Sequence, residues 1–137
     1  MTMDKKTAYE LNGTSLAYAG DAVVELFMRT YLLSLGVTDT ARYNELALLF
    51  VTARAQSEAY AKIETSLTEE ETEILKRGRN AKLTHRPKNQ TQSDYRRATG
   101  FEALMGYLYL TGNVQRAEEL FNLAYIDILD GILNKNL

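Results

Sequence analysis

Residues 15–29, with the sequence SLAYAGDAVVELFMR, predict a long amphipathic helix around which the rest of the chain is organised. The helix is expected to begin at Thr14 or Ser15, which are suited to an N-cap, and to stop before Gly36. That span is about 20 residues, or roughly 30 Å at about 1.5 Å per residue. The residues spaced to face the core are Leu16, Ala19, Val23, Leu26 and Phe27.

One acid, Asp21, interrupts this apolar pattern directly after Gly20. A buried carboxylate is costly unless it gains hydrogen bonds, an opposite charge or a metal ion, so a partner is expected. The best candidate is Glu102, an acid inside the apolar helical run ATGFEALMGYLYL at residues 98–110. We therefore expect the two acids to share a cation. The alternative is that each acid pairs with an arginine or caps a backbone group.

Three glycines lie inside helical patterns, at Gly20, Gly100 and Gly106. A glycine within a helix costs about 1 kcal/mol relative to alanine, which suggests helix backbones that must approach closely. Contact between the turns of Gly20 and Gly106 would bring Asp21 and Glu102 together. The alternative is that these glycines reflect neutral drift.

The pattern is helical almost throughout, which predicts an all-α fold and a single domain over residues 1–137. A second helix is expected from Thr38 or Asp39 to about residue 63. A third begins at a capping box, Thr68 with Glu71, and its end is signalled by Gly78. The fourth should be central and run from about residue 93 to 111, and the last helix should follow residue 113 and fray after residue 131.

Composition indicates a globular protein without export or membrane signals. The 137 residues are 45% hydrophobic and 25% charged, with no cysteine for disulfides or thiolate chemistry. The start, MTMDKKTAYELNG, lacks an apolar signal segment, and no run approaches the roughly 18 apolar residues of a membrane span. A cytoplasmic location without membrane attachment is the expectation.

Charge is concentrated in one segment, although the formal net charge is only -2. Residues 76–97 carry eight basic side chains and one acid, which is typical of a site for a polyanion. A solvated face without a ligand is the alternative, and His85 in the same loop either contacts a phosphate or has no role. The candidate binding residues are Lys76, Arg77, Arg79, Asn80, Lys82, Lys88, Asn89, Arg96 and Arg97.

Two segments of the chain resemble the acidic motifs of the ribonuclease III catalytic domain: GDAVVEL at residues 20–26 and FEALMGYLYL at 101–110. With RGRNAK at residues 77–82 between them and no second domain, the chain is most similar to the short bacterial Mini-III ribonucleases. The resemblance covers residues 16–110 and implies a catalytic domain without an attached double-stranded-RNA-binding domain. It implies an endoribonuclease that cleaves double-stranded RNA.

The metal chemistry expected of Asp21 and Glu102 is that of a hard cation. Carboxylate oxygens, no cysteine and one histidine favour Mg²⁺, for which Mn²⁺ can substitute, over zinc. Such an ion activates water, so no nucleophilic side chain is required. The larger ribonucleases of the family use four acids, and two of these positions carry Ala17 and Thr99 here. Glu25, one turn after Asp21, is either a water-mediated ligand, a residue of the second shell behind the metal ligands, or a salt-bridge residue.

The expected partners follow from the same resemblance and from the basic segment. Duplex RNA is recognised by its shape and phosphates, and no aromatic residue lies inside the basic run before Tyr95 to stack on single-stranded bases. Tyr18 falls at the position where ribonuclease III proteins have a bulky side chain that inserts into the partner subunit, so the resemblance implies a homodimer. The alternative is that Tyr18 lies in the core. The implied substrate is the precursor of 23S ribosomal RNA. The rival interpretation is a non-catalytic RNA-binding or ribosome-assembly module on the same fold.

Overall fold

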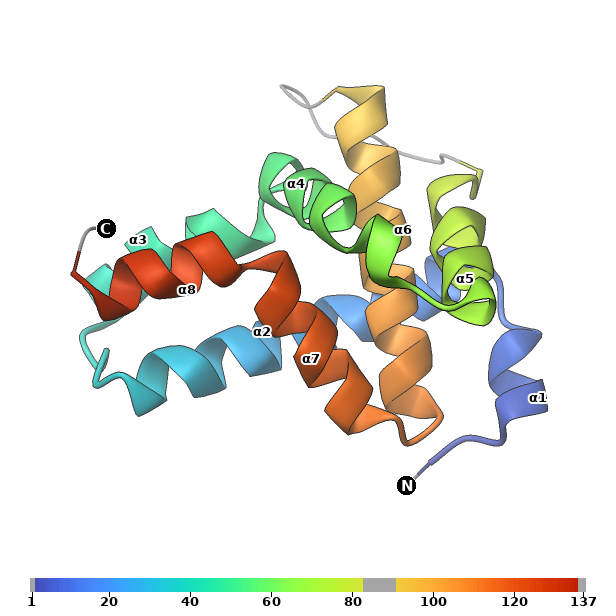
Figure 1. Cartoon of the computed structure of the whole chain (residues 1–137), viewed down its shortest axis with the longest axis horizontal. Coiled ribbons are helices and arrows are strands. Elements are labelled where there is room, and N and C mark those ends of the chain that lie inside the picture. The colour runs from blue at the N-terminus through green and yellow to red at the C-terminus, as the bar shows by residue number, and fades with distance from the viewer. Residues whose placement is uncertain (1, 83–90, 136–137) are drawn as a thin grey trace.

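The structure is a computed structural model that describes residues 2–82 and 91–135. All regular secondary structure in these two ranges is helical, which confirms the all-α prediction (Figure 1). Within the same ranges, no helix has the length and apolar content that crossing a membrane requires. The helices are α1 (Lys5–Tyr9), α2 (Gly13–Ser34), α3 (Thr40–Val51), α4 (Ala53–Ile63), the 3₁₀ turn η1 (Glu64–Ser66), α5 (Glu69–Arg79), α6 (Gln92–Leu110), α7 (Val114–Ala124) and α8 (Ile126–Leu133).

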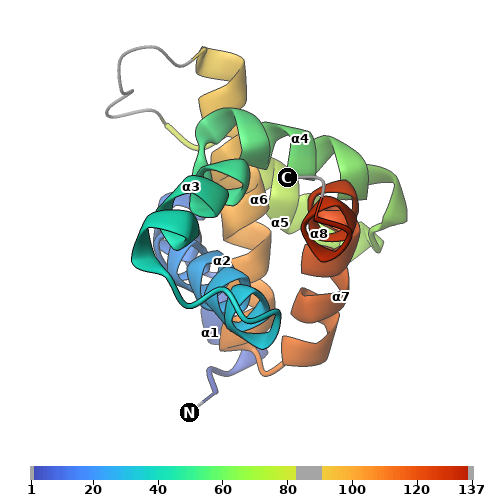
Figure 2. The same ribbon diagram turned by 90° about the vertical axis from the view of Figure 1, so that its left-hand side faces the viewer.

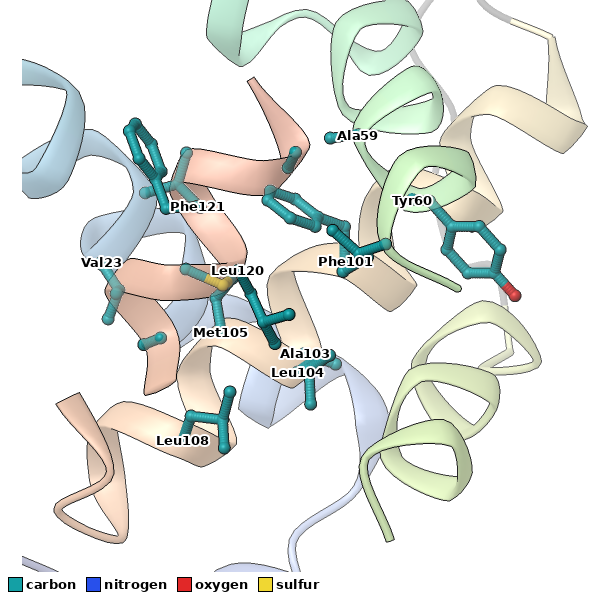
Figure 3. Packing of buried hydrophobic residues seen from close by; sticks show 14 of the residues in the cluster. Val23, Ala59, Tyr60, Phe101, Ala103, Leu104, Met105, Leu108, Leu120 and Phe121 are labelled. Atoms are coloured by element: carbon teal, nitrogen blue, oxygen red, sulfur yellow. The ribbon is translucent and has the colours of Figure 1, made fainter. Parts of the chain in front are cut away.

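Helix α6 is the central element, as the sequence predicts. It packs against α2, α4 and α5, and the other helices surround it in both views (Figures 1 and 2). It can do so because it is apolar on most sides, so that Phe101, Leu104 and Met105 are fully buried. Figure 3 shows these α6 side chains in one cluster with Leu120 and Phe121 of α7.

Two glycines bring the backbones of α2 and α6 into contact. A Cβ atom on Gly20 would lie 1.6 Å from the carbonyl oxygen of Glu102. A Cβ atom on Gly106 would lie 2.1 Å from the carbonyl oxygen of Leu16. No side chain fits at either position, so the predicted close approach is confirmed and neutral drift is excluded for both glycines.

A second glycine contact joins α5 to α6. A Cβ atom on Gly78 would lie 2.6 Å from that of Ala103, and one on Gly100 would lie 2.7 Å from the carbonyl oxygen of Leu75. The prediction that Gly78 ends its helix is wrong, because α5 continues to Arg79. Gly78 is required by the packing of two helices and not by a turn.

Helix α2 differs from its prediction at its start and on its buried face. It begins at Gly13, with the Asn12 side chain accepting from a backbone N–H three residues later at 2.8 Å. It ends before Gly36, as predicted. The prediction that Leu26 faces the core is wrong, because this side chain is 52% exposed while Val24 and Met28 are buried. Apolar residues occupy both stripes of α2, so periodicity alone could not choose between them.

Two of the predicted helices are each broken into two. Thr52 separates α3 from α4, and its side chain accepts from the backbone N–H of Ala55 at 3.1 Å. Tyr125 separates α7 from α8, and its buried hydroxyl donates to the carbonyl oxygen of Phe50 at 2.8 Å. The first break has a local cap, whereas the residue at the second break is bonded to a distant part of the chain.

The N-terminus of α5 has the predicted capping box. The Thr68 hydroxyl accepts from the backbone N–H of Glu71 at 3.1 Å, and the Glu71 carboxylate accepts from the backbone N–H of Thr68 at 3.0 Å. The same carboxylate pairs with Arg116 of α7 at 2.9 Å. These contacts anchor one end of α5, and its other end presents the basic residues.

Candidate active site

A pocket of about 410 Å³ between α2, α4 and α6 contains both predicted acids. The Gly20–Gly106 contact explains their proximity, because Asp21 directly follows Gly20 on α2 and the Glu102 carbonyl lies against that glycine. The pocket is lined by Thr14, Ala17, Tyr18, Asp21, Val51, Ala53, Gln56, Ala81, Lys82, Tyr95, Ala98, Thr99 and Glu102.

Asp21 and Glu102 differ in their exposure to solvent. Asp21 is exposed at the edge of the pocket, so the premise that its charge is buried is wrong. The argument from burial applies to Glu102, whose residue is largely covered by the protein. The pair therefore combines an inner carboxyl with an outer one that solvent or a ligand can reach.

The pKa of Glu102 is raised to about 9, chiefly by burial and also by the hydrogen bond with Asp21 and the negative charge of Asp21. The Gln56 amide acts in the opposite direction. Neither carboxylate forms an ion pair with lysine or arginine within residues 2–82 and 91–135. Two acids that share one pocket without a basic partner hold a proton between them or a cation.

Gln56 is a site residue that the sequence analysis did not identify. Its side chain is 3% exposed on α4, and its Nε2 donates to Oε2 of Glu102 at 3.5 Å. Burying an amide is unfavourable unless it is hydrogen-bonded. The bond to Glu102 meets this need of Gln56 and at the same time restrains the orientation of the Glu102 carboxyl. The signal available in the sequence was a polar residue on the apolar face of α4 between Ala53 and Tyr60.

The positions where larger relatives carry two further acids also line the pocket. Ala17 supplies no ligand, and the Thr99 hydroxyl donates to the carbonyl oxygen of Tyr95 at 2.9 Å. No cluster of three or more acidic, histidine or cysteine ligands occurs in the part of the chain that the structure describes. Any metal held here would therefore have two protein carboxylates and would keep several waters, as Mg²⁺ usually does.

Glu25 has partners of its own and does not line the pocket. Its carboxylate pairs with the Arg29 guanidinium at 2.7 Å and accepts from the Tyr43 hydroxyl at 2.8 Å. Of the roles considered from the sequence, the structure therefore shows the salt bridge. A role of Glu25 behind a metal ligand or through a water stays a prediction.

Tyr18 lies on the exposed side of α2, at the margin of the pocket. Its side chain is 86% exposed, which excludes the alternative of a core tyrosine. Leu26 is exposed on the same helix, eight residues later, which places it just over two turns along and about 80° round the helix axis from Tyr18. Part of this apolar side of α2 is therefore uncovered in the single chain.

The predicted RNA-binding residues separate into two groups. Lys76, Asn80, Lys82 and Arg97 are exposed, and Lys82 lines the pocket that contains the two acids. Arg77, Arg79 and Arg96 are partly buried and bonded to other parts of the protein. Lys88, Asn89 and His85 lie outside the described residues.

Arg77 and Arg96 hold the fold together. Arg77 donates to the carbonyl oxygens of Tyr9 and Leu11, and its guanidinium lies 4.4 Å from the centre of the Tyr9 ring. Arg96 donates to the carbonyl oxygens of Arg79 and Ala81, at 3.3 and 3.4 Å. Both guanidinium groups therefore have a structural role in the protein, and contact of Arg77 and Arg96 with RNA stays a prediction.

Comparison with known proteins gives consistent results. The family model described as the ribonuclease III domain matches residues 14–113. A mini-ribonuclease 3 from Enterococcus faecalis is 48% identical over 115 residues, which cover 82% of this chain and 87% of that protein. A mini-ribonuclease 3 from Clostridium tetani is 43% identical over 120 residues, covering 87% and 80%. A crystal structure of a protein from Fusobacterium nucleatum aligns with a TM-score of 0.78 and 33% identity, covering 87% of this chain and 91% of the other.

Proposed function

The chain belongs to the ribonuclease III family and is an endoribonuclease, and from this premise we propose that it cleaves double-stranded RNA with a Mg²⁺ ion held by Asp21 and Glu102. One observation carries the proposal. The two carboxyl groups share a pocket, and within the described ranges neither has a basic partner. Mn²⁺ is the expected substitute, because it accepts the same oxygen ligands.

The donor set of the pocket fits a hard divalent cation. Asp21 and Glu102 offer carboxylate oxygens, and the pKa of Glu102 is raised first by its burial and then by the neighbouring Asp21 carboxylate, which a cation between them would offset. When bound, Mg²⁺ supplies positive charge and an acidified water for hydrolysis of a phosphodiester. Glu102 has to lose its proton before it can act as a ligand, so binding of the ion releases a proton.

Three side chains of the pocket have separate roles in positioning the metal ligands and the substrate. Gln56 donates to one oxygen of Glu102 and so restrains the direction of the inner carboxyl. Asp21 is exposed and faces the side from which a substrate must approach. Lys82 lines the same pocket and is placed to bind a phosphate near the scissile bond.

The exposed basic residues support binding of a duplex. Lys76, Lys82 and Arg97 are exposed and have no acidic partner in the described parts of the chain. Contacts of this kind recognise the phosphates of an A-form helix without reading its sequence. Affinity should therefore fall steeply with salt concentration.

A homodimer is the proposed assembly. Tyr18 and Leu26 are large apolar side chains on the exposed side of α2, and contact with a second copy would cover them. Tyr18 also lines the pocket with Asp21, so a partner subunit that contacts Tyr18 would lie next to the phosphodiester that is cleaved. Two such sites facing one duplex would cut both strands.

The precursor of 23S ribosomal RNA is the proposed substrate, and the cytoplasm the proposed location. The support is similarity to proteins named mini-ribonuclease 3, together with exposed basic side chains of the kind that bind an RNA backbone.

The test compares two acids of α2 that differ in position. Asp21→Asn removes the exposed ligand, whereas Glu25→Gln changes an acid one turn away that binds Arg29 and Tyr43. With a labelled RNA duplex and Mg²⁺, we expect Asp21→Asn to lower kcat by more than the roughly 100-fold typical of an outer-shell partner. Glu25→Gln should retain the activity of the wild-type protein, and EDTA should abolish cleavage in both.

Binding without cleavage by the wild-type protein would contradict the proposal and support a non-catalytic RNA-binding module. Equal losses in Asp21→Asn and Glu25→Gln would also contradict it, because the pocket would then have no special importance. The folded state of each variant is checked by circular dichroism and by its melting temperature.

A further inference from the structure

Tyr60 connects two arginines across the meeting point of α4, α5 and α6. Its residue is 2% exposed, yet its hydroxyl accepts from Nη1 of Arg79 on α5 at 3.2 Å. The Arg97 guanidinium of α6 lies over the same ring, with Cζ 5.6 Å from the ring centre. Figure 3 shows the hydroxyl of Tyr60 pointing away from the labelled core side chains. One buried tyrosine therefore contacts both guanidinium groups.

Both arginines line a second cavity of about 410 Å³, at the C-terminal end of α5 and the N-terminal end of α6. No acidic side chain lines it, and neither arginine forms an ion pair with an acid within residues 2–82 and 91–135. The cavity shares no lining residue with the pocket of Asp21 and Glu102. Its remaining lining residues are Asn80, Gln92, Ser93 and Arg96.

The position of Tyr60 is itself fixed by packing. A Cβ atom on Gly100 would lie 3.1 Å from Cε2 of Tyr60, so the glycine of α6 makes room for the ring. A ring held between α4 and α6 cannot move without disturbing the core. The hydroxyl and the ring face are therefore fixed points for the two longer and more mobile side chains.

Holding an arginine in place before its ligand arrives has an energetic advantage. An arginine side chain loses up to about 2 kcal/mol of rotamer entropy when it becomes ordered. A contact that orders the side chain in the free protein removes part of this cost from the binding step. A guanidinium stacked on a ring keeps several N–H donors for an anion.

We propose that Tyr60 is a positioning residue, which holds Arg79 and Arg97 as a preorganised pair for one phosphate group of the RNA backbone. This inference rests on the proposed function, because it assigns a particular phosphate-binding subsite to the same RNA complex. Tyr60 acts through the two arginines and takes no part in the chemistry at Asp21 and Glu102.

The experiment uses Tyr60→Phe, which keeps the ring under Arg97 and removes only the hydroxyl that orients Arg79. The matched control is Tyr9→Phe, which removes a hydroxyl bonded to Glu73 beside another stacked arginine, Arg77, outside the cavity. Binding to a labelled RNA duplex is measured over a series of salt concentrations, with Asp21→Asn present in every protein to prevent cleavage. Cleavage kinetics are measured separately with Asp21 intact.

We expect Tyr60→Phe to raise Kd by about threefold to tenfold, the effect of one hydrogen bond. The dependence of log Kd on log salt should become shallower by up to about 0.9, the value for one phosphate contact. In the cleavage assay, KM should rise while kcat at saturating RNA stays unchanged. Tyr9→Phe should leave Kd, the salt dependence and KM at their wild-type values.

A double-mutant cycle with Arg79→Ala tests whether Tyr60 acts through that arginine. In the Arg79→Ala background, Tyr60→Phe should have no further effect on Kd. The proposal is overturned if Tyr60→Phe binds RNA like the wild-type protein, if its effect persists without Arg79, or if it lowers kcat with KM unchanged. Absence of any RNA binding by the protein with Tyr60 intact would instead reject the proposed function, and this inference with it.

Discussion

The two acids and the basic residues are positioned by different kinds of contact. Asp21 and Glu102 are brought together by the backbones of α2 and α6, which touch at Gly20 and Gly106. The basic residues at the ends of α5 and α6, here called the basic side, are positioned by their own side chains. Arg77 and Arg96 bind carbonyl oxygens, and Arg79 and Arg97 contact Tyr60. The first arrangement tolerates almost no substitution, whereas the second can be changed one bond at a time. The acids therefore depend on the fold as a whole, and the binding side can be adjusted separately.

The largest effect is expected from Gly20→Ala. The added Cβ would lie 1.6 Å from the carbonyl oxygen of Glu102, so α2 and α6 would have to separate. We expect a loss of more than about 4 kcal/mol in the free energy of unfolding, in the range of the most damaging single substitutions. Urea denaturation, or the failure to obtain folded protein, measures this effect.

Gly36→Ala is the matched control for that prediction. Gly36 has a positive φ of 85°, and nothing lies within 4 Å of an added Cβ. The substitution should therefore cost only the backbone strain, about 1 to 3 kcal/mol. Equal destabilisation by the two substitutions would show that contact between α2 and α6 is not what makes Gly20 necessary.

An intermediate effect is expected from Glu102→Gln in the metal-free protein. The pKa of Glu102 rises from 4.5 to about 9 on folding, so the folded state holds this proton more tightly than the unfolded state. The stability that this proton contributes is fully present below pH 4.5 and is lost as pH rises towards 9. Glutamine cannot titrate, so the variant should lack this loss and melt a few degrees higher than the wild-type protein at pH 8.

Addition of Mg²⁺ should reverse the order of the two proteins. The ion should raise the melting temperature of the wild-type protein at pH 8 and leave that of Glu102→Gln almost unchanged, because only the carboxylate can bind it tightly. Thermal melts at pH 5 and pH 8, with and without Mg²⁺, provide the measurement. A wild-type melting temperature that Mg²⁺ does not affect would contradict the assignment of the metal site.

The smallest effects concern the basic side, where Arg77→Ala and Lys82→Ala should act differently. Arg77 binds the carbonyl oxygens of Tyr9 and Leu11, so its loss should cost about 1 to 2 kcal/mol of stability. Lys82 is exposed in the pocket of the acids, so its loss should leave stability within about 0.5 kcal/mol. For Lys82→Ala, the salt dependence of RNA binding should become shallower by about 0.9.

Urea denaturation and RNA binding over a salt series separate these two outcomes. If Arg77→Ala changed the salt dependence of RNA binding and left the stability intact, Arg77 would be assigned to the RNA-binding residues. Loss of stability in Lys82→Ala would assign it a structural role.

The sequence was most informative where one residue type has an evident physical cost. Gly20 and Gly106 are unfavourable inside helices, so their presence predicted the contact that the structure shows. The role of Arg77 could not be predicted, because its carbonyl partners lie 66 and 68 residues away in the chain. Gln56 was missed for a similar reason, since its partner Glu102 lies 46 residues away.

Local patterns also failed where two arrangements share the same periodicity. Thr52 lies in a sequence that continues as a helical pattern on both sides, and only its side-chain bond to the backbone of Ala55 reveals the break. Leu26 is as apolar as Val24, so hydrophobicity could not tell which of the two would be buried. Such choices depend on tertiary packing and not on the residue itself.

Helix α6 carries both Arg97 and Glu102 on one rigid rod. Five residues of helix correspond to about 7.5 Å along its axis, at about 1.5 Å per residue. If Arg97 binds a phosphate as proposed, the helix fixes the distance between that phosphate and the phosphodiester that is cleaved. The position of cleavage would then depend on the spacing of Arg97 and Glu102, and inserting or deleting a residue between them in α6 would change it.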